Sequence, residues 1–297
     1  MSAPVTATDV EHDENHALEI VDVSKKFYVA GRQVHALAHI DLTVDEGEFV
    51  SIVGSSGCGK STLLRLILGL DTEYDGDIRV NGKRVERPGL DRSIVFQEHR
   101  LLPWLSVEAN VSAALRQSRS SAAEKRELVR EHLHLVGLDQ FAKAYPAQLS
   151  GGMAQRVAIA RALVTKPRFL LLDEPLGALD ALTRLRLQDE LVRIVRHEGT
   201  TAVLVTHDVD EAVYLGNRVI IMHPHPGRIA TILPVTDAVS RDRSDPNFIR
   251  LRDEVLSWLG VSKGGSEANA LAGGRVSALL PGPADGPARR PTGLAVI

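Results

Sequence analysis

The sequence predicts an α/β domain with a largely parallel sheet and a helical subdomain inserted into it. From about Ala17 onward, short apolar runs alternate with helical patterns, which is the layout of repeated strand–helix units. The run from Phe169 to Leu172 is apolar at every position, as expected of a strand that is buried on both faces. The stretch from about Val107 to Leu149 has helical patterns and no convincing strand.

Composition narrows the class of protein. The 297 residues carry a net charge of −3, with acidic and basic residues interspersed, so the basic stripe of a nucleic-acid-binding module is absent. A single cysteine excludes an internal disulfide framework and fits a reducing compartment. No run reaches the roughly 18 apolar residues of a membrane span. The first residues lack the basic and apolar regions of a secretory signal. We therefore expect a cytoplasmic chain that needs a partner for any role at a membrane.

Periodicity predicts the individual elements. The apolar runs predict five strands, at Glu48–Val53, Ser93–Phe96, Phe169–Leu172, Ala202–Val205 and Val219–Met222. Helical spacing predicts helices at Thr62–Leu70, Ala122–Val136, Ala178–His197 and Phe248–Leu259. We expect Leu128 and Leu135 to face inward on the second of these helices. The third has an apolar face of Leu179, Leu182, Leu185, Leu191 and Ile194.

We expect one main domain with a tail at each end. Residues 1–16 are polar and aperiodic, which is typical of a flexible terminus. The domain is expected over 17–240, with the helical subdomain at about 98–160, and a C-terminal helix is expected within 241–262. Gly, Ala, Pro and Ser dominate 263–297, a composition that cannot bury enough apolar surface to fold, so we expect this tail to be disordered.

A phosphate-binding loop is predicted directly after the first of these strands. Its sequence, GSSGCGKS, matches the pattern G-x-x-x-x-G-K-[ST] and leads into a helix. Glycines let successive N–H groups point at phosphate oxygens, and the helix N-terminus favours negative charge. Lys60 would reach the β- and γ-phosphates, and the Ser61 hydroxyl would bind Mg²⁺. The expected contacts are Gly54, Ser55, Ser56, Gly57, Cys58, Gly59, Lys60, Ser61 and Thr62.

Two questions stay open for this segment. It could be a glycine-rich turn without a ligand. Cys58 could be a reactive thiol next to a helix N-terminus, although a small residue that fits a crowded loop is the favoured interpretation.

Two acids follow the most apolar strand, Asp173 and then Glu174. Ligands of α/β sheets bind at the carboxyl ends of parallel strands. Asp173 is suited to hold Mg²⁺, and Glu174 is suited to act as the general base that polarises an attacking water. A solvated strand end would show the same two residues without either role.

A further anion site is indicated at Ser150, Gly151 and Gly152, which open a helix rich in Ala, Ile and Val. Alone, this tripeptide indicates no more than a helix cap. Together with the phosphate loop, however, the segments LSGGMAQRVAIARA and LLLDEP have the order and spacing of nucleotide-binding domains of ABC transporters, which the chain resembles from about Leu18 to Pro234.

This resemblance implies a P-loop NTPase fold, with a RecA-like core, a small antiparallel β part and the inserted helical subdomain. It implies ATP as substrate, Mg²⁺ as cofactor and a head-to-tail homodimer. Ser150, Gly151 and Gly152 would then contact the γ-phosphate that the other subunit holds.

The same resemblance assigns roles to four residues that would mean little alone. Gln97 corresponds to the family's Q-loop glutamine, which touches Mg²⁺ or the attacking water. His207 corresponds to the switch histidine that contacts the γ-phosphate. Asp180 belongs to the D-loop, which links the two sites of the dimer. Phe27 lies where the family stacks an aromatic ring on adenine, with Tyr28 as the neighbouring candidate.

The segments VFQEHRLLPWLSVEANV and HPHPGRI resemble cassettes for nitrate, sulfonate and taurine uptake, and aliphatic sulfonate is our first choice. This implies a peripheral protein on the cytoplasmic face of the cell membrane, with permease subunits and, indirectly, a periplasmic solute-binding protein. Trp104 is expected in an exposed partner surface, unless it packs into the helical subdomain. A nitrate or taurine import ATPase and a non-transport ABC ATPase stay open as second and third interpretations. The non-transport ATPase is disfavoured because the chain has one phosphate loop and no long coiled coil.

Overall fold

The computed structural model describes residues 16–29, 31–236 and 242–261, which belong to one compact unit. Our expected tails at 1–16 and 263–297 lie outside the described residues, apart from His16. That residue begins the first strand instead of ending a tail, because it pairs with Asp45 in a β-ladder.

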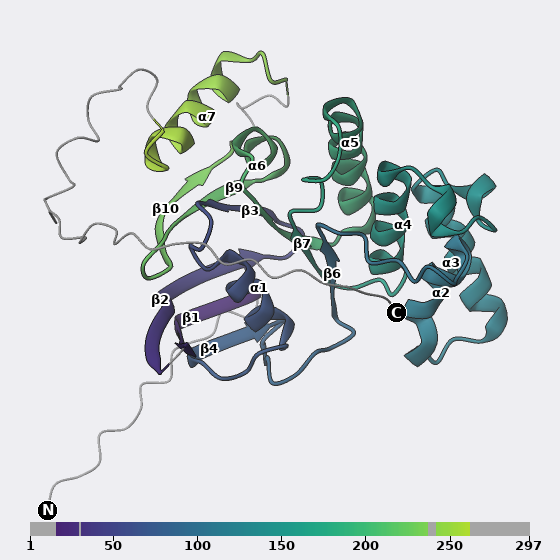
Figure 1. Cartoon of the computed structure of the whole chain (residues 1–297), viewed down its shortest axis with the longest axis horizontal. Helices are drawn as coiled ribbons and strands as arrows, with labels where there is room; N and C mark the ends of the chain where they lie inside the picture. The colour runs from purple at the N-terminus through teal and green to yellow at the C-terminus, as the bar shows by residue number, and fades with distance from the viewer. Residues whose placement is uncertain (1–15, 30, 237–241, 262–297) are drawn as a thin grey trace, which may run out of the picture. The chain divides into compact units, whose positions relative to one another are not determined.

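A six-stranded sheet forms the centre of the fold, in the order β10–β9–β3–β8–β7–β6 (Figure 1). Five strands are parallel, and β10 alone is antiparallel to its neighbour. This confirms the predicted α/β class. The bounds are β3 Phe49–Gly54, β6 Arg92–Phe96, β7 Phe169–Asp173, β8 Thr201–Thr206, β9 Arg218–His223 and β10 Arg228–Pro234.

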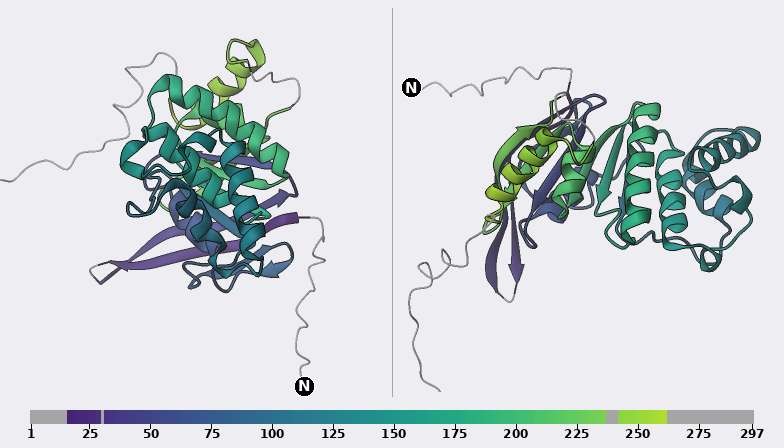
Figure 2. Two further views of the ribbon diagram at one scale, coloured as in Figure 1. Left: turned by 90° about the vertical axis from the view of Figure 1, so that its right-hand side faces the viewer. Right: turned by 90° about the horizontal axis from the view of Figure 1, so that it is seen from above.

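A second, antiparallel sheet has the order β2–β1–β4–β5. Its strands are β1 His16–Val29, β2 Arg32–Asp45, β4 Asp75–Val80 and the two-residue β5 Lys83–Arg84. Figure 2 shows β1 and β2 as a long ribbon away from the helices α2–α4. This sheet is the small antiparallel part that the family resemblance implied.

Three of the helices form a group of their own. The helices α2, α3 and α4 pack on one another, and no strand lies between Val107 and Leu149, as predicted. The bounds are α1 Lys60–Leu68, α2 Val107–Ala113, α3 Ala122–Leu135, α4 Gly151–Leu163, α5 Ala181–Glu198, α6 Val209–Leu215 and α7 Pro246–Trp258. Short 3₁₀ helices lie at Ala114–Gln117, Asp139–Phe141 and Pro146–Gln148. Within the described ranges no helix is long and apolar enough to cross a lipid bilayer.

One expected helix face was right and one was wrong in detail. On α3, Leu128 and Leu135 are half-buried and pack against the core, as predicted, and the fully buried residues of this helix are Val129, His132 and Leu133. On α5, Leu182 and Leu185 are exposed, and burial begins at Leu187. Spacing shows that a helix has an apolar face, but it does not show along which part of its length a neighbour covers that face.

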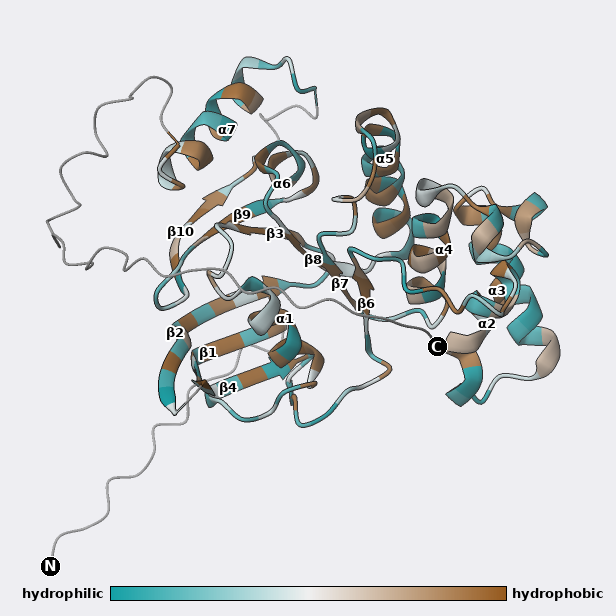
Figure 3. Ribbon diagram, viewed as in Figure 1, coloured by the Kyte–Doolittle hydropathy of each residue, from teal (hydrophilic) through white to brown (hydrophobic). Residues whose placement is uncertain are grey.

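The core lies on both faces of the central sheet. Alternate residues of β7 enter different clusters: Leu170 and Leu172 join the one that contains the residues of α4 and α5. Phe169 and Leu171 join the one that contains α1 and the antiparallel sheet. Apolar side chains therefore fill both faces of the central strands, and the ribbon of these strands is coloured mainly as hydrophobic in Figure 3. This double burial fixes the strands that carry the predicted site residues at their carboxyl ends.

Candidate active site

The phosphate loop joins a fully buried strand, β3, to the first turn of α1. Gly57 and Gly59 have φ angles of 79° and 96°, values that favour glycine because they clash with a Cβ atom. The loop curls around the ammonium of Lys60. Its Nζ donates to the carbonyl oxygens of Gly54 at 2.7 Å and Ser55 at 3.3 Å. The strand, the loop and the helix thus take the arrangement that the sequence predicted.

Cys58 packs inside this loop. Its side chain is buried, and a Cβ atom at Gly54 would come within 2.5 Å of its Sγ. The geometry favours a small residue in a crowded loop over a reactive thiol, since reactive cysteines are partly exposed.

Asp173 and Glu174 leave the carboxyl end of β7. Burial raises the pKa of Asp173, the neighbouring Glu174 adds to that effect, and Lys60 opposes it. Glu174 has a φ of 47°, an uncommon backbone conformation for a residue with a side chain. Its N–H donates to the carbonyl oxygen of Val205 at 2.8 Å. The sheet edge therefore holds Glu174 in a strained, defined position and not as a solvated strand end.

His207 follows β8, the strand next to β7. Its Nδ1 lies 3.1 Å from Oε2 of Glu174, and the side chains of His207 and Glu174 are 66% and 25% exposed. The histidine is therefore paired with the carboxylate and remains open to solvent. The parallel register explains the pairing, because Val205 and Asp173 are directly opposite each other.

The residues predicted to hold Mg²⁺ lie close to this edge. Ser61 and Asp173 line one cavity of about 640 Å³. The amide of Gln97 lies against the turn after Glu174, since a Cβ atom on Gly177 would come within 3.2 Å of Gln97 Nε2.

This donor set fits a magnesium ion. Hydroxyl, carboxylate and amide oxygens suit the ion, and a cation would offset the burial that raises the pKa of Asp173. Across the described ranges no group of three or more His, Cys, Asp or Glu side chains could hold a metal. Any Mg²⁺ here would therefore need further oxygens from a nucleotide or from water.

The tripeptide Ser150–Gly152 begins α4. Ser150 is the N-cap and accepts a hydrogen bond from the Met153 N–H at 3.3 Å. Ser150 and Gly151 are exposed. Gly151 lines a pocket with Gln97, whereas Ser61 lines the cavity with Asp173. This helix start is therefore exposed and lines a pocket apart from the cavity of Ser61 and Asp173.

Three further predicted positions lie at the surface. Phe27 is 38% exposed, and Lys25 Nζ lies 4.9 Å from the centre of its ring. Tyr28 is 79% exposed, so both aromatic candidates are accessible. Asp180 caps α5 by accepting from the Thr183 N–H at 3.0 Å, and this bonding lowers the pKa of Asp180.

Two residues of α4 escaped the sequence reasoning. Gln155 donates to the Phe96 carbonyl at 3.1 Å. Arg161 donates to the carbonyls of His99 and Arg100, each at 2.8 Å. They hold the segment around Gln97 to the helix that begins at Ser150. A side chain that bonds a distant backbone carbonyl leaves no signal in sequence spacing.

The comparisons with known proteins decide the family. Over 241 residues the chain is 50% identical to the "Aliphatic sulfonates import ATP-binding protein SsuB" of Bacillus subtilis (strain 168), covering 81% of this chain and 93% of that protein. The chain belongs to the ABC transporter family. It is an ATPase of that family.

Further matches of this ABC ATPase agree. Residues 37–177 match the family described as ABC transporter. The "Bicarbonate transport ATP-binding protein CmpC" of Synechococcus elongatus is 47% identical over 259 residues, which are 84% of this chain and 39% of that protein.

Two solved structures share the fold of the ABC ATPase. The first is described as "Dimeric Structure of MJ0796, a Bacterial ABC Transporter Cassette". It has a TM-score of 0.66 at 33% identity, covering 74% of this chain and 99% of the other. The second is cbiO1 from Clostridium perfringens, part of the ABC transporter complex cbiONQ. It has a TM-score of 0.69 at 26% identity, covering 83% of this chain and 98% of the other.

Proposed function

We propose that this ABC ATPase hydrolyses ATP with Mg²⁺ in a head-to-tail homodimer and thereby drives import of a small anionic solute, most specifically aliphatic sulfonates. The observation that carries the solute class is the 50% identity to SsuB of Bacillus subtilis over 93% of that protein. The match extends over nearly the whole relative, so it is not confined to the ATP site.

Each part of the nucleotide has a matching protein group. The loop Gly54–Thr62 would wrap the phosphates, with Lys60 turning its ammonium from the loop carbonyls to the β- and γ-phosphates. Ser61, Asp173 and Gln97 would hold Mg²⁺, which neutralises charge on the phosphate oxygens when bound. Phe27 or Tyr28 would stack on the base.

Glu174 and His207 would perform the chemistry. Glu174 would accept a hydrogen bond from the attacking water and orient it toward the γ-phosphate. His207 would exchange its contact with Glu174 for one with the γ-phosphate. Its 66% exposure supports this role, because the ring can reach a ligand outside the fold.

A second copy of the chain would complete the site. Ser150 and Gly151 are exposed at a helix start, so their N–H groups can reach a phosphate held by a partner. Asp180 would link the two sites. The dimeric description of the MJ0796 cassette supports this arrangement.

The solute path requires other proteins. Trp104 is 70% exposed in the segment after Gln97, which supports a surface for permease subunits at the cytoplasmic face of the membrane. A periplasmic solute-binding protein would deliver the solute to the permease. A bicarbonate importer is the second candidate, favoured by the 47% identity to CmpC, and nitrate or taurine import remains an alternative from the sequence resemblance.

The experiment replaces Lys60 with Met in the chromosome of the source organism. We expect loss of growth on an alkanesulfonate as sole sulfur source and normal growth on sulfate. Normal growth on the sulfonate, combined with a defect on nitrate, taurine or bicarbonate, would replace sulfonate by that solute.

A further inference from the structure

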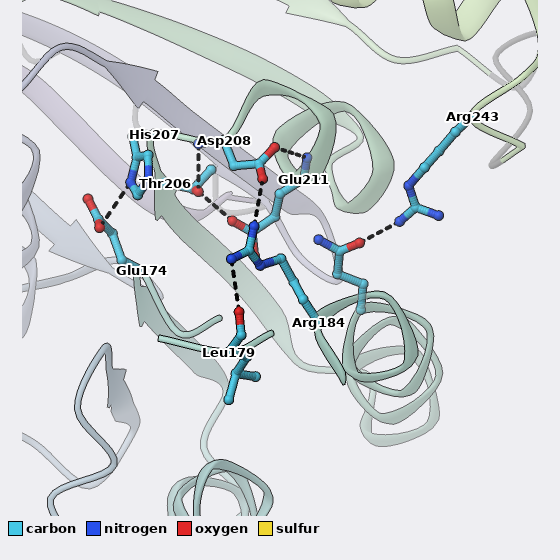
Figure 4. A network of polar contacts seen from close by, with 9 residues as sticks. Glu174, Leu179, Arg184, Thr206, His207, Asp208, Glu211 and Arg243 are labelled. Carbon is cyan, nitrogen blue, oxygen red and sulfur yellow. Dashed lines mark hydrogen bonds and ion pairs between the residues drawn. The ribbon is translucent and has the colours of Figure 1, made fainter. Parts of the chain in front are cut away.

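Arg184 joins two turns of the active site. It lies in the first turns of α5, and its Nη2 donates to the carbonyl oxygen of Leu179 at 3.0 Å. Its Nη1 lies 3.5 Å from Oδ2 of Asp208 (Figure 4). Leu179 belongs to the turn that follows Glu174, and Asp208 is the residue after His207. One guanidinium therefore links the segment of the carboxylate to the segment of the histidine.

The second of these turns is held by several hydrogen bonds. Asp208 caps α6, because its Oδ1 accepts from the Glu211 N–H at 3.0 Å. The Asp208 N–H donates to the hydroxyl of Thr206 at 3.1 Å, and that hydroxyl donates to the Glu211 carboxylate. Residues on both sides of His207 are thus fixed, and Arg184 binds to the fixed part.

A small cavity lies between these groups. Glu174, His207, Arg184 and Glu211 are among the residues that line its volume of about 20 Å³. Arg184 Nε and Glu211 Oε1 are buried and have no hydrogen-bond partner among the described residues. Such a volume holds about one water molecule, which needs two or more polar partners. The guanidinium therefore lines the same small polar cavity as Glu174 and His207.

The sheet alone does not fix the pair. The Glu174 N–H bonds to the neighbouring strand, but the turn from Pro175 to Leu179 lies outside the ladder. The side chain of His207 is mostly exposed. Among the described residues, Arg184 is the side chain that hydrogen-bonds both the Leu179 carbonyl and Asp208.

We propose that Arg184 is a positioning residue, which holds the turn after Glu174 against the turn that carries His207 and so keeps the base and the histidine in register during ATP hydrolysis. This proposal rests on the proposed function in one respect: it takes Glu174 as the general base and His207 as the contact to the γ-phosphate. A purely structural anchor of α5 would stabilise the fold without affecting turnover selectively.

The test measures steady-state ATP hydrolysis by the full-length chain, together with its melting temperature. We expect Arg184→Met to lower kcat at least tenfold and to leave the KM for ATP within twofold, because the phosphate loop is untouched. Arg184→Lys should recover part of kcat, since an ammonium can reach one of the two acceptors. The control is Arg196→Met, which removes an exposed arginine from the far end of the same helix and should change neither constant.

A double-mutant cycle with Asp208→Asn separates positioning from folding. Asparagine still caps α6 but ends the ion pair, so this variant stays informative if Arg184→Met unfolds. We expect Asp208→Asn to lower kcat, and the double variant to be no slower than Arg184→Met. Unchanged kcat in Arg184→Met, or losses that multiply in the double variant, would overturn the proposal.

A parallel assay of Glu174→Gln keeps the two claims apart. Loss of hydrolysis in Glu174→Gln with full activity in Arg184→Met would leave the proposed function standing and reject the positioning role. A wild-type chain without ATPase activity would reject both.

Discussion

Nδ1 of His207 lies 3.1 Å from Oε2 of Glu174, so the imidazole is paired with the proposed general base. The two residues end neighbouring parallel strands, β8 and β7. A γ-phosphate would compete with the carboxylate for the imidazole. Binding of ATP would then release Glu174 toward the attacking water, which couples recognition of the third phosphate to activation of the base.

The stability of the protein should depend on the ionisation of Glu211. Burial raises the pKa of Glu211 to about 7 and Asp208 adds to this, while the Thr206 hydroxyl, Arg184 and His207 oppose it. A raised carboxyl pKa favours folding while the group is protonated in both states. That contribution is complete below the ordinary value of 4.5 and is lost as the pH rises to about 7.

Glu211→Gln cannot ionise. We therefore expect its free energy of unfolding, relative to that of the wild type, to rise by up to about 3 kcal/mol as the pH increases from 4.5 to 7.5. Urea unfolding of both proteins at each pH measures this difference. The matched control is Glu131→Gln, which changes an exposed acid on α3 and should give no such difference. A constant gap between the wild type and Glu211→Gln across this range would contradict the burial of an ionisable Glu211.

Gly152 should tolerate substitution less well than Gly151. A Cβ atom on Gly152 would lie 2.5 Å from Cγ2 of Thr183, whereas one on Gly151 would lie 3.7 Å from Leu179 Cδ2. We expect Gly152→Ala to lower the free energy of unfolding by about 1–3 kcal/mol, and Gly151→Ala to be near neutral. Adding Thr183→Ser, which removes the clashing methyl, should restore part of the loss. Equal urea midpoints for the two alanine variants would show that the contact between α4 and α5 is loose.

Trp104 should matter for transport more than for hydrolysis. Because its side chain is 70% exposed, Trp104→Ala should leave the fold and the basal ATPase activity of the isolated chain unchanged. Solute uptake by the assembled transporter should fall at least fivefold, as expected when a large anchor leaves an interface. Trp258→Ala, at the end of α7, is the matched control and should preserve uptake. Equal losses of uptake and basal ATPase activity would argue against a coupling surface at Trp104.

The parts of the site that are built from residues adjacent in the sequence could be predicted from the sequence. The phosphate loop, the acids after β7 and Ser150 each lie at a junction between a strand or loop and a helix, where local patterns determine the backbone. Contacts between distant segments were not predictable. Arg184 and Asp208 are 24 residues apart, and Gln155 and Phe96 are 59 apart. Side-chain bonds across such separations depend on how elements pack, which periodicity does not encode.

The most direct test of the account compares ATP binding, ATP hydrolysis and oligomeric state of the wild type with those of Glu174→Gln in the presence of Mg²⁺. We expect the wild type to hydrolyse ATP and the variant to bind ATP, fail to hydrolyse it and accumulate as a dimer. That result would assign the base to Glu174 and the completed site to two chains. A Glu174→Gln protein that turns over ATP at the wild-type rate as a monomer would contradict both assignments.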